Sequence, residues 1–559
     1  MQLQDVKKTI ALLALGVLTA CAGSNASSGA MIPFQHDAAR SRPAASSVLT
    51  TIVGVGDSLT AGYQADGFLG QTGVKNPLPN TRGQIPPTQE NGWWTLLVEQ
   101  ASSSSVETAI NTVYDPAKSP LPLIKGPGLD NQIVPNNNLY QPFAQFKGSD
   151  PCTFDNSFNQ AGFGLRASMR VRMNPNATTI RDFGVPGITL HEANVIHQPE
   201  TDTCSPLPGI PGLLSDVVNE ESGTFWPVLR NFTRLGGNLT EVNAAASVHP
   251  TLATVWLGAN DVLKYMGSGG RFVGGDRNAA QAQADLRATI STLQHAGARV
   301  VVANLPNILE TGYFQRVTVP PHPHRQCRIQ SYASCLLALG GLQHNLPAIA
   351  KKYGLGTPNG CVPASTSAPC GYLTLPGAVL ILQYANTYNG NIPDLDCANP
   401  KPGCKPVKGS GLGMNYITPA FAGKVQVLNN AINQGIADAA TASHVPLVDI
   451  QGIFHGLASG NPANPYFQLA SSISPGLCCT LGYYYQTPGS RFSLPGGVLS
   501  FDGIHPSNSG YALIAYAFID TINKAYGTAI PQVDLAAVYN GTRCSDKRYC
   551  FEDPYAAHP

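Results

Sequence analysis

Short runs of apolar, often β-branched residues alternate with longer amphipathic segments along this chain, and this alternation limits the possible folds most strongly. The runs at 48–55, 178–183, 254–257, 298–303 and 445–450 have the length and composition of strands. The segments at 92–101, 278–295, 420–442 and 511–526 show helical periodicity. Such alternation predicts a parallel sheet with helices on both faces, in which ligands bind beyond the carboxyl ends of the strands.

The composition narrows the class of protein. The 559 residues include 34 Lys+Arg and 33 Asp+Glu, and the formal net charge of +1 argues against a nucleic-acid-binding protein. Charged residues make up only 12%, against about 25% in typical soluble domains, but the 43% hydrophobic content argues against disorder. The length allows several domains or one domain with large insertions.

The first 20 residues have the pattern of an export signal. Two lysines precede an apolar run at 10–18 that is too short to cross a bilayer. Residues 18–21, Leu-Thr-Ala-Cys, resemble the lipobox of bacterial lipoproteins, which implies acylation of Cys21 and anchoring to a membrane of the cell envelope. A plain secretory signal cut near Ala20 or Ala22 is the alternative and would give a periplasmic or secreted protein. Residues 21–47 are expected to form a flexible tether.

The cysteine count agrees with export. Without Cys21, the 13 cysteines leave twelve, an even number typical of an oxidising compartment. Short sequence separation suggests the disulfides Cys327–Cys335, Cys361–Cys370, Cys397–Cys404 and Cys544–Cys550, and Cys152–Cys204 is a longer candidate. Cys478 and Cys479 are unassigned, and other connectivities stay open. His322 and His324 beside Cys327 are better explained by a proline-rich loop with a disulfide than by a metal site.

Residues 54–60, Gly-Val-Gly-Asp-Ser-Leu-Thr, follow the first predicted strand and fit neither of two common motifs. A dinucleotide fingerprint needs glycine at 59, and a GxSxG nucleophile elbow needs glycine at 60. What remains is Ser58 at a tight strand-to-helix junction, with its hydroxyl exposed and its backbone N–H near a positive helix end. A serine that only caps a helix has the same appearance.

Asp502 stands three residues before His505, just ahead of the closing helix. One turn can bring the carboxylate against the imidazole, where it holds Nδ1–H and leaves Nε2 as a base for Ser58. Gly187 follows the second predicted strand and Asn260 the third, so both are expected at the same edge of the sheet. The backbone N–H groups of Ser58 and Gly187 and the side-chain amide of Asn260 are the expected oxyanion donors.

Four short blocks resemble, in order, the signature blocks of the SGNH/GDSL hydrolases: 56–59 (Gly-Asp-Ser-Leu), Gly187, 258–261 (Gly-Ala-Asn-Asp) and 502–505 (Asp-Gly-Ile-His). The resemblance implies a flavodoxin-like three-layer α/β/α sandwich with a central parallel sheet in the order 2-1-3-4-5. It also implies Ser58 as nucleophile, Gly187 and Asn260 as oxyanion donors, and Asp502 and His505 as the rest of the triad. The second block departs from the family, because many members carry asparagine before its first glycine, where this chain has Asp182-Phe183.

The four blocks are spread much further apart than a compact core of about 200 residues requires. We expect one hydrolase domain at 48–527 with insertions near 70–170, 199–250, 315–419 and 454–499, and a C-terminal tail at 528–559. The twelve cysteines fall in these insertions or the tail, so the insertions are expected to be large disulfide-stapled loops. The stretches 378–382 and 483–485 could line an acyl pocket or only pack the insertions' own cores.

A zinc-protease motif at His191 is incomplete. HExxH needs histidine at 195, where Val195 stands. His191 and His197 lie roughly 240° apart around a helix of 3.6 residues per turn, so they cannot share one metal. No metal or organic cofactor is expected.

The sequence therefore predicts an exported, lipid-anchored serine hydrolase of the esterase or lipase type that cleaves carboxylic esters through an acyl-enzyme. The expected substrates are small-molecule, lipid or acylated-glycan esters, and nucleic acid is not an expected partner. Removal of O-acetyl groups from a carbohydrate is an alternative with the same chemistry. A non-enzymatic surface lipoprotein on a hydrolase scaffold is the alternative from another class.

Overall fold

The structure is a computed structural model that describes a large part of the chain. The described residues are 46–64, 89–115, 117–125, 171–172, 177–196, 228–229, 233–234, 237–267, 269–272, 274–316, 346–355, 361, 365–374, 377, 395, 415–459, 463–473, 484–485, 492–493, 498–499 and 503–544. The signal, the tether and Cys21 lie outside them.

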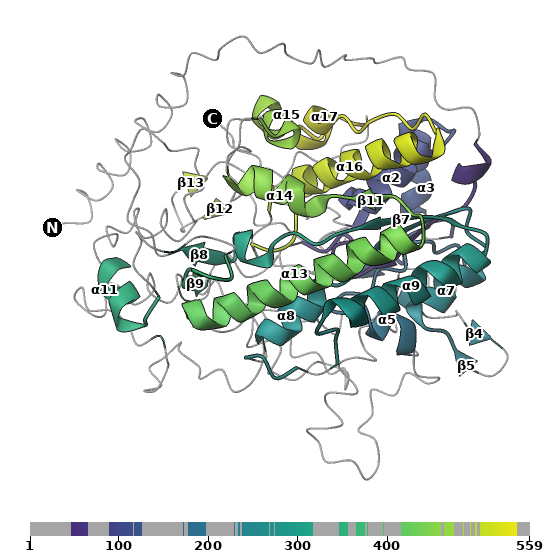
Figure 1. Cartoon of the computed structure of the whole chain (residues 1–559). Coiled ribbons are helices and arrows are strands. Elements are labelled where there is room, and N and C mark those ends of the chain that lie inside the picture. Colours follow the sequence, from purple (N-terminus) through teal and green to yellow (C-terminus); the bar gives the residue numbers. More distant parts are fainter. Residues whose placement is uncertain are drawn as a thin grey trace.

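A parallel sheet of four strands forms the centre of the fold (Figure 1). Its order is β1 (Ile52–Gly56), β6 (Leu252–Trp256), β7 (Arg299–Ala303) and β11 (Leu447–Val448). Ile52 lies opposite Leu252, which in turn lies opposite Arg299. All residues of β1 and β6 are buried, as parallel strands are when helices cover both faces of the sheet. The predicted α/β class and four of the five predicted strands are confirmed.

The prediction of a second strand at 178–183 is wrong. It forms no strand but a single parallel bridge, between Asp182 and Gly54, on the free edge of β1, where Gly54 N donates to Arg181 O and Phe183 N to Gly54 O, both at 2.9 Å. The backbone N–H groups of Arg181 and Asp182 both donate to Pro120 O, at 2.7 and 3.0 Å. Because Pro120 O takes the N–H of Arg181, the pairing with β1 does not continue from Asp182 back towards residue 178.

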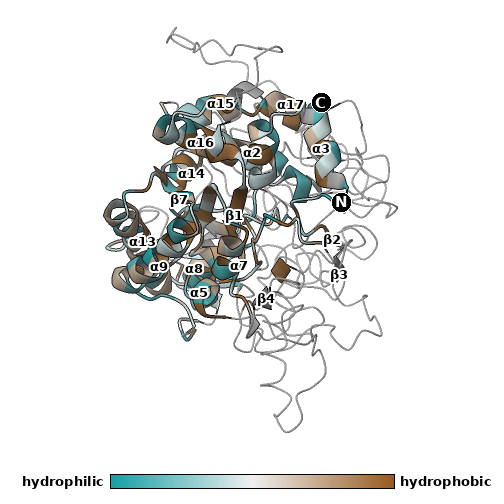
Figure 2. Ribbon diagram, turned by 90° about the vertical axis from the view of Figure 1, so that its right-hand side faces the viewer, coloured by the Kyte–Doolittle hydropathy of each residue, from teal (hydrophilic) through white to brown (hydrophobic). Residues whose placement is uncertain are grey.

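Helices cover both faces of the sheet (Figures 1 and 2). One layer contains α7 (Glu241–Ser247), α9 (Ala279–His295) and α13 (Pro419–Ala442), and the other contains α2 (Trp93–Ala101) and α16 (Asn508–Tyr526). The helices α2, α9, α13 and α16 confirm the predicted helical segments. In the core, the ring of Trp93 stacks on Phe518 at 4.0 Å and meets Trp256 edge-on at 6.0 Å, so α2 and α16 are packed against the sheet.

Shorter elements surround this core. The helices are η1 (Ser47–Leu49), η2 (Gln89–Asn91), α3 (Val106–Tyr114), α5 (Glu192–Val195), α8 (Ala259–Gly267), η4 (Ile308–Glu310), α11 (Leu346–Lys352), α14 (Ile450–Ser459), α15 (Pro465–Ile473) and α17 (Leu535–Tyr539). The two-residue strands β2 (Ile124–Lys125), β3 (Val171–Arg172), β4 (Thr233–Arg234), β5 (Gly237–Asn238), β12 (Tyr484–Tyr485) and β13 (Phe492–Ser493) form antiparallel pairs.

The segment expected to be a C-terminal tail contributes to the core as far as the structure describes it. Ile530, Val533 and Val538 are buried against the main hydrophobic cluster. The guanidinium of Arg543 forms a buried ion pair with Glu99 of α2. Residues 528–544 therefore help to hold α2 in place.

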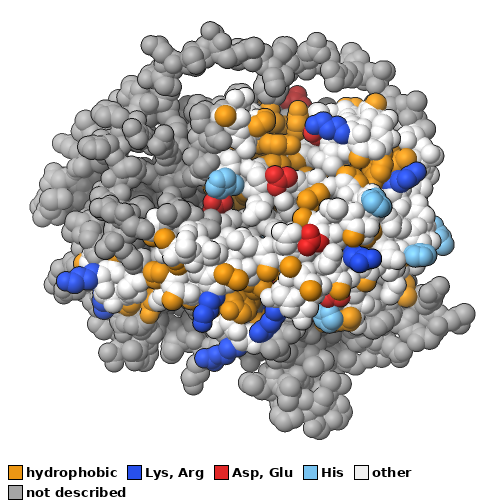
Figure 3. All heavy atoms as spheres, viewed as in Figure 1, with side chains coloured by type: hydrophobic (Ala, Val, Ile, Leu, Met, Phe, Trp, Pro, Cys, Tyr) orange, Lys and Arg blue, Asp and Glu red, His pale blue; other side chains and the backbone are white. Residues whose placement is uncertain are grey.

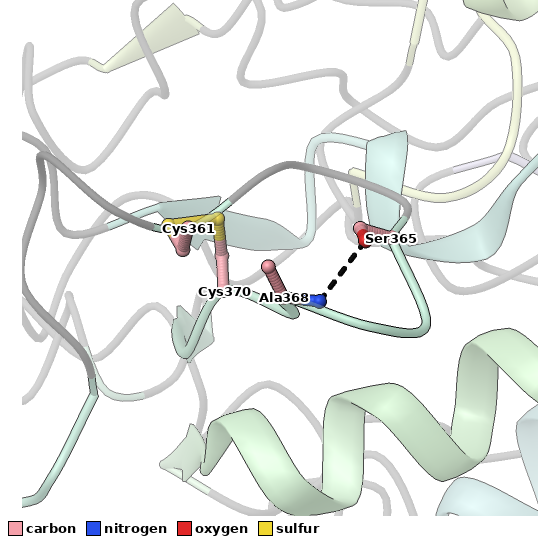
Figure 4. Close-up of a disulfide and its surroundings, with 4 residues drawn as sticks. All are labelled: Cys361, Ser365, Ala368 and Cys370. Carbon is pink, nitrogen blue, oxygen red and sulfur yellow. Dashed lines mark hydrogen bonds between the residues drawn. A yellow bond between two sulfur atoms is a disulfide. The ribbon is translucent and has the colours of Figure 1, made fainter.

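The stretch expected as an insertion at 315–419 carries a small antiparallel sheet and a disulfide. The sheet order is β10 (Tyr416–Ile417), β9 (Tyr372–Thr374) and β8 (Phe314–Arg316). The predicted Cys361–Cys370 disulfide is confirmed, and within its loop Ser365 Oγ accepts a hydrogen bond from Ala368 N at 3.1 Å (Figure 4). Cys544 also takes part in a disulfide. The other cysteines, together with His322, His324 and His197, lie outside the described residues.

The described surface is sparsely charged. On the face shown in Figure 3, Lys, Arg, Asp and Glu side chains stand singly or in small groups among uncharged ones. Within the described segments, no helix combines the length and the apolar character needed to cross a bilayer.

Asp182 is buried at the edge of the sheet, with 1% of its surface exposed. Its Oδ1 accepts a hydrogen bond from Gly184 N at 3.0 Å, and burial raises the pKa of its carboxyl to about 8. The side chain is therefore largely protonated at neutral pH. In that state it carries both a hydrogen-bond donor and an acceptor, as an asparagine side chain does.

Replacing Asp182 with asparagine should stabilise the protein in a pH-dependent way. An unfolded aspartate has a pKa of about 3.9, so above that pH the wild-type chain must take up a proton here on folding, at a cost that grows up to about pH 8. The gain in the free energy of unfolding of Asp182→Asn should increase by on the order of 2 kcal/mol or more from pH 5 to pH 8. Urea unfolding at both pH values measures it.

The control is Asp520→Asn, at a partly exposed position of α16 where the carboxylate pairs with Lys524, which should change the free energy of unfolding by no more than about 0.5 kcal/mol at either pH. An equal gain for Asp182→Asn at both pH values would contradict this account of Asp182.

Candidate active site

Ser58 lies in a turn that directly follows β1. The carbonyl oxygen of Asp57 accepts hydrogen bonds from Thr60 N and Ala61 N at 3.1 and 3.0 Å, and its Oδ1 accepts one from Leu59 N at 2.9 Å. The helix expected at this junction is wrong: residues 58–62 form only turns. The backbone N–H groups after Ser58 thus fold back onto Asp57, and no helix dipole acts on Ser58 from its own segment.

Ser58 and His505 are in hydrogen-bond contact, although 447 positions separate them. The Nε2 atom of His505 lies 2.8 Å from Ser58 Oγ. The imidazole is 4% exposed, and the ring of Tyr63 packs against it at 4.7 Å between centroids. A hydroxyl beside a confined imidazole nitrogen is the arrangement of a nucleophile and its general base.

Two hydrogen bonds join the turn after Ser58 to the first turn of α16, which His505 precedes. Tyr511 Oη donates to Tyr63 O at 2.6 Å, and Gln64 Nε2 donates to Asn508 Oδ1 at 2.8 Å. Ser507 caps the helix by accepting a hydrogen bond from Gly510 N at 3.1 Å. The Ser58–His505 geometry is therefore held by neighbouring bonds and does not depend on that contact alone. Asp502, the third predicted member of the triad, lies outside the described residues.

Asn260, in the first turn of α8, connects the Ser58 turn with the Gly187 loop. Its Nδ2 donates to Asp57 Oδ2 at 3.2 Å and to Ile188 O at 3.0 Å. Ser58 and Gly187 are the immediate neighbours of these two acceptors. Through these two bonds, Asn260 connects the segments that carry Ser58 and Gly187, the other two predicted oxyanion residues.

The donors in this group differ in availability. The backbone N–H groups of Ser58 and Gly187 make no hydrogen bond to other described residues, whereas both N–H groups of the Asn260 amide have acceptors. Gly187 has φ +86°, a left-handed conformation that strains any residue with a Cβ, although the space around it is open. Its glycine is therefore required by the backbone.

Asp57 is a site residue to which the sequence analysis assigned no role. It is 1% exposed, and its carboxyl accepts from Leu59 N and Asn260 Nδ2. Burial raises the pKa of Asp57 to about 7, while the bond from Leu59 N and the nearby His505 act in the opposite direction. Its position directly before Ser58, inside the first block, was the available signal.

A small, largely apolar pocket lies beside Ser58 and His505. Its lining includes Trp256, Leu263, Ile308, Phe454 and Ile504. The cavity volume is about 20 Å³, enough for one or two water molecules or a methyl-sized group. The stretches 378–382 and 483–485, expected to line such a pocket, lie outside the residues whose side chains the structure describes.

Comparison with protein-family models, with curated proteins and with solved structures found no match. The interpretation of the site therefore rests on this chain's own geometry. That geometry joins a hydroxyl, an imidazole, two available backbone N–H groups and an apolar pocket at the carboxyl ends of the strands.

Proposed function

We propose that this protein is a serine hydrolase that cleaves carboxylic esters, with Ser58 as nucleophile and His505 as general base. The observation that carries the proposal is the 2.8 Å contact between His505 Nε2 and Ser58 Oγ. Burial of the imidazole and its packing against Tyr63 also support it, because a base confined in one orientation loses little entropy on reaction.

The reaction begins when His505 Nε2 takes the proton of Ser58 and Oγ forms a bond to the ester carbonyl carbon. The tetrahedral intermediate collapses as His505 returns that proton to the leaving alcohol, which leaves an acyl group on Ser58. A water molecule, deprotonated by His505, then attacks the acyl carbon. Release of the carboxylic acid restores the Ser58 hydroxyl. In this proposal Asp502 orients the imidazole, as the fourth sequence block implies.

The oxyanion of each tetrahedral intermediate would receive hydrogen bonds from Ser58 N and Gly187 N. Preorganised donors of this kind contribute more than any other single effect in many acyl-transfer enzymes. Asn260 would supply a third bond by turning away from Asp57 Oδ2, the longer of its two contacts at 3.2 Å. Without substrate, Asn260 keeps its bond to Asp57 Oδ2 and so connects the segments that carry Ser58 and Gly187.

We also propose that the chain belongs to the SGNH/GDSL type of hydrolase. The four blocks support this, and so does the arrangement of Asp182, β1, β6, β7 and β11, which follows the order 2-1-3-4-5 when the single bridge stands for the second strand. The proposed domain extends over 48–527 with four insertions, and the Cys361–Cys370 disulfide in the third supports stapling of these loops.

The pocket supports esters with a short acyl group. A cavity of about 20 Å³ lined by Leu263, Ile308 and Phe454 suits a methyl group better than a fatty chain. This favours acetyl esters, including O-acetyl groups on glycans, over long-chain lipids. No metal or organic cofactor enters the proposed reaction.

The proposed location is the bacterial cell envelope, with the chain attached to a membrane through lipid on Cys21. The export signal and the lipobox-like residues 18–21 support this placement. The disulfide between Cys361 and Cys370 supports an oxidising compartment.

Hydrolysis of p-nitrophenyl acetate, butyrate and octanoate tests the proposal. The wild-type protein should prefer acetate, and Ser58→Ala and His505→Ala should each lower kcat/KM by at least about a thousandfold. His295→Ala, at an exposed position of α9, should leave activity unchanged. A wild-type chain that turns over none of these esters, or a Ser58→Ala variant as active as wild type, would favour the non-enzymatic lipoprotein.

Gly187→Ala tests the oxyanion role against a matched backbone change. Gly527, the C-cap of α16, has φ +64° and open space around it, as Gly187 has at +86°. Both alanine variants should lose about 1 kcal/mol of stability from the left-handed backbone. Only Gly187→Ala should also lower kcat, by about tenfold or more, because its N–H is displaced. Equal kcat values in the two variants would remove Gly187 from the oxyanion site.

A further inference from the structure

Away from Ser58, one imidazole and two carboxylates converge beside the start of α9. They belong to His191, which precedes α5, to Asp276, which precedes α9, and to Asp285 in the second turn of α9. One ligand atom from each lies within 4.8 Å of the others, and His191 Nδ1 lies 2.8 Å from Asp285 Oδ2.

Asp276 is the unusual member of this group. It is 4% exposed, and its Oδ2 is buried without any hydrogen-bond partner. A buried carboxylate directed at a second carboxylate is costly unless a cation or a proton lies between them.

Neighbouring basic side chains are engaged elsewhere. Lys264 Nζ bonds to both carboxylate oxygens of Glu192, at 2.9 and 2.8 Å. The guanidinium of Arg277 lies over the ring of Tyr265. Asp261 is also satisfied, because its carboxyl accepts from Leu190 N and Asp276 N. Among the described residues, His191 is the one basic side chain paired with this carboxylate cluster, through Asp285.

We propose that His191, Asp276 and Asp285 bind one first-row divalent cation such as Zn²⁺, with water completing the coordination shell. One imidazole nitrogen and two carboxylate oxygens suit zinc or manganese, whereas Ca²⁺ and Mg²⁺ prefer oxygen ligands alone. The pairing of His191 with His197, excluded by their helical spacing, is not involved. The cation is structural: it joins the loop that carries Gly187 to α9 and takes no part in the ester reaction.

A cation at this site would restrain the loop that carries Gly187, because the loop is short. His191 lies four residues after Gly187, and Leu190 N already donates to Asp261 at 2.9 Å. A cation on His191 would add a second attachment point for this loop. The inference does not depend on the proposed hydrolase activity, since metal binding can be measured without any substrate.

Zinc titration of the full-length chain, purified and freed of metal with EDTA, tests the site. Calorimetry and elemental analysis should find one Zn²⁺ per chain, and saturating Zn²⁺ should raise Tm by at least about 2 °C. Asp276→Asn and Asp285→Asn should each raise Kd by about tenfold or more. Mg²⁺ should give no shift at the same concentration.

His455→Ala is the matched control. His455 Nδ1 lies 2.9 Å from Glu310 Oε1, an imidazole–carboxylate pair without the second carboxylate, so its loss should leave zinc binding unchanged. In the metal-free state Asp276→Asn should be at least as stable as wild type, because like charges are removed. The inference is overturned if the wild type binds no zinc stoichiometrically, or if Asp276→Asn and Asp285→Asn bind it as tightly as wild type.

Discussion

The contact between Ser58 and His505 depends on the meeting of two chain segments that are far apart in sequence. β1 delivers Ser58 to the edge of the sheet, and the start of α16 delivers His505 to the same place. The stacking of Trp93 on Phe518 fixes α16 and α2 together over the sheet, and the bonds from Tyr511 and Gln64 fix the turn. The Ser58–His505 contact is thus held in place by packing and hydrogen bonds that do not include it.

Buried carboxyl groups surround the carboxyl ends of β1 and β6. Asp57, Asp182 and Asp261 each accept backbone N–H bonds, and Glu241 Oε1 accepts one from Gly56 N at 2.6 Å. Burial raises the pKa of all four. These groups hold the loops that follow the strands, and burial outweighs the hydrogen bonds that favour their charged form. Their folded-state pKa values are raised, so they stabilise the fold most at low pH, and this stabilisation falls as the pH rises towards 7 and 8.

Much of the architecture could be predicted from the sequence because strand and helix patterns are local. Residues 298–303 and 278–295 show their structure in their own composition. The strand at 178–183 could not be predicted correctly, because Pro120 O takes the N–H groups of Arg181 and Asp182, a competition set by tertiary contacts.

Ser58, Gly187, Asn260 and His505 could be predicted as candidate site residues from the order of the sequence blocks. Three of these blocks follow predicted strands, and the carboxyl ends of parallel strands meet at one edge of the sheet. The partners of Asn260 and the role of Asp57 needed coordinates, because hydrogen bonds of a buried amide depend on orientation. The cluster of His191, Asp276 and Asp285 could also be found only from the coordinates. His191 and Asp285 are 94 positions apart and share no motif.

The central claim is that Ser58 is an activated nucleophile, and covalent labelling tests it most directly. A fluorophosphonate probe should add to the intact wild-type chain once, and peptide mass spectrometry should place the adduct on Ser58. Labelling should be abolished in Ser58→Ala and slowed by at least about a hundredfold in His505→Ala. A wild-type chain that stays unlabelled, or one whose adduct falls on another serine, would contradict the account.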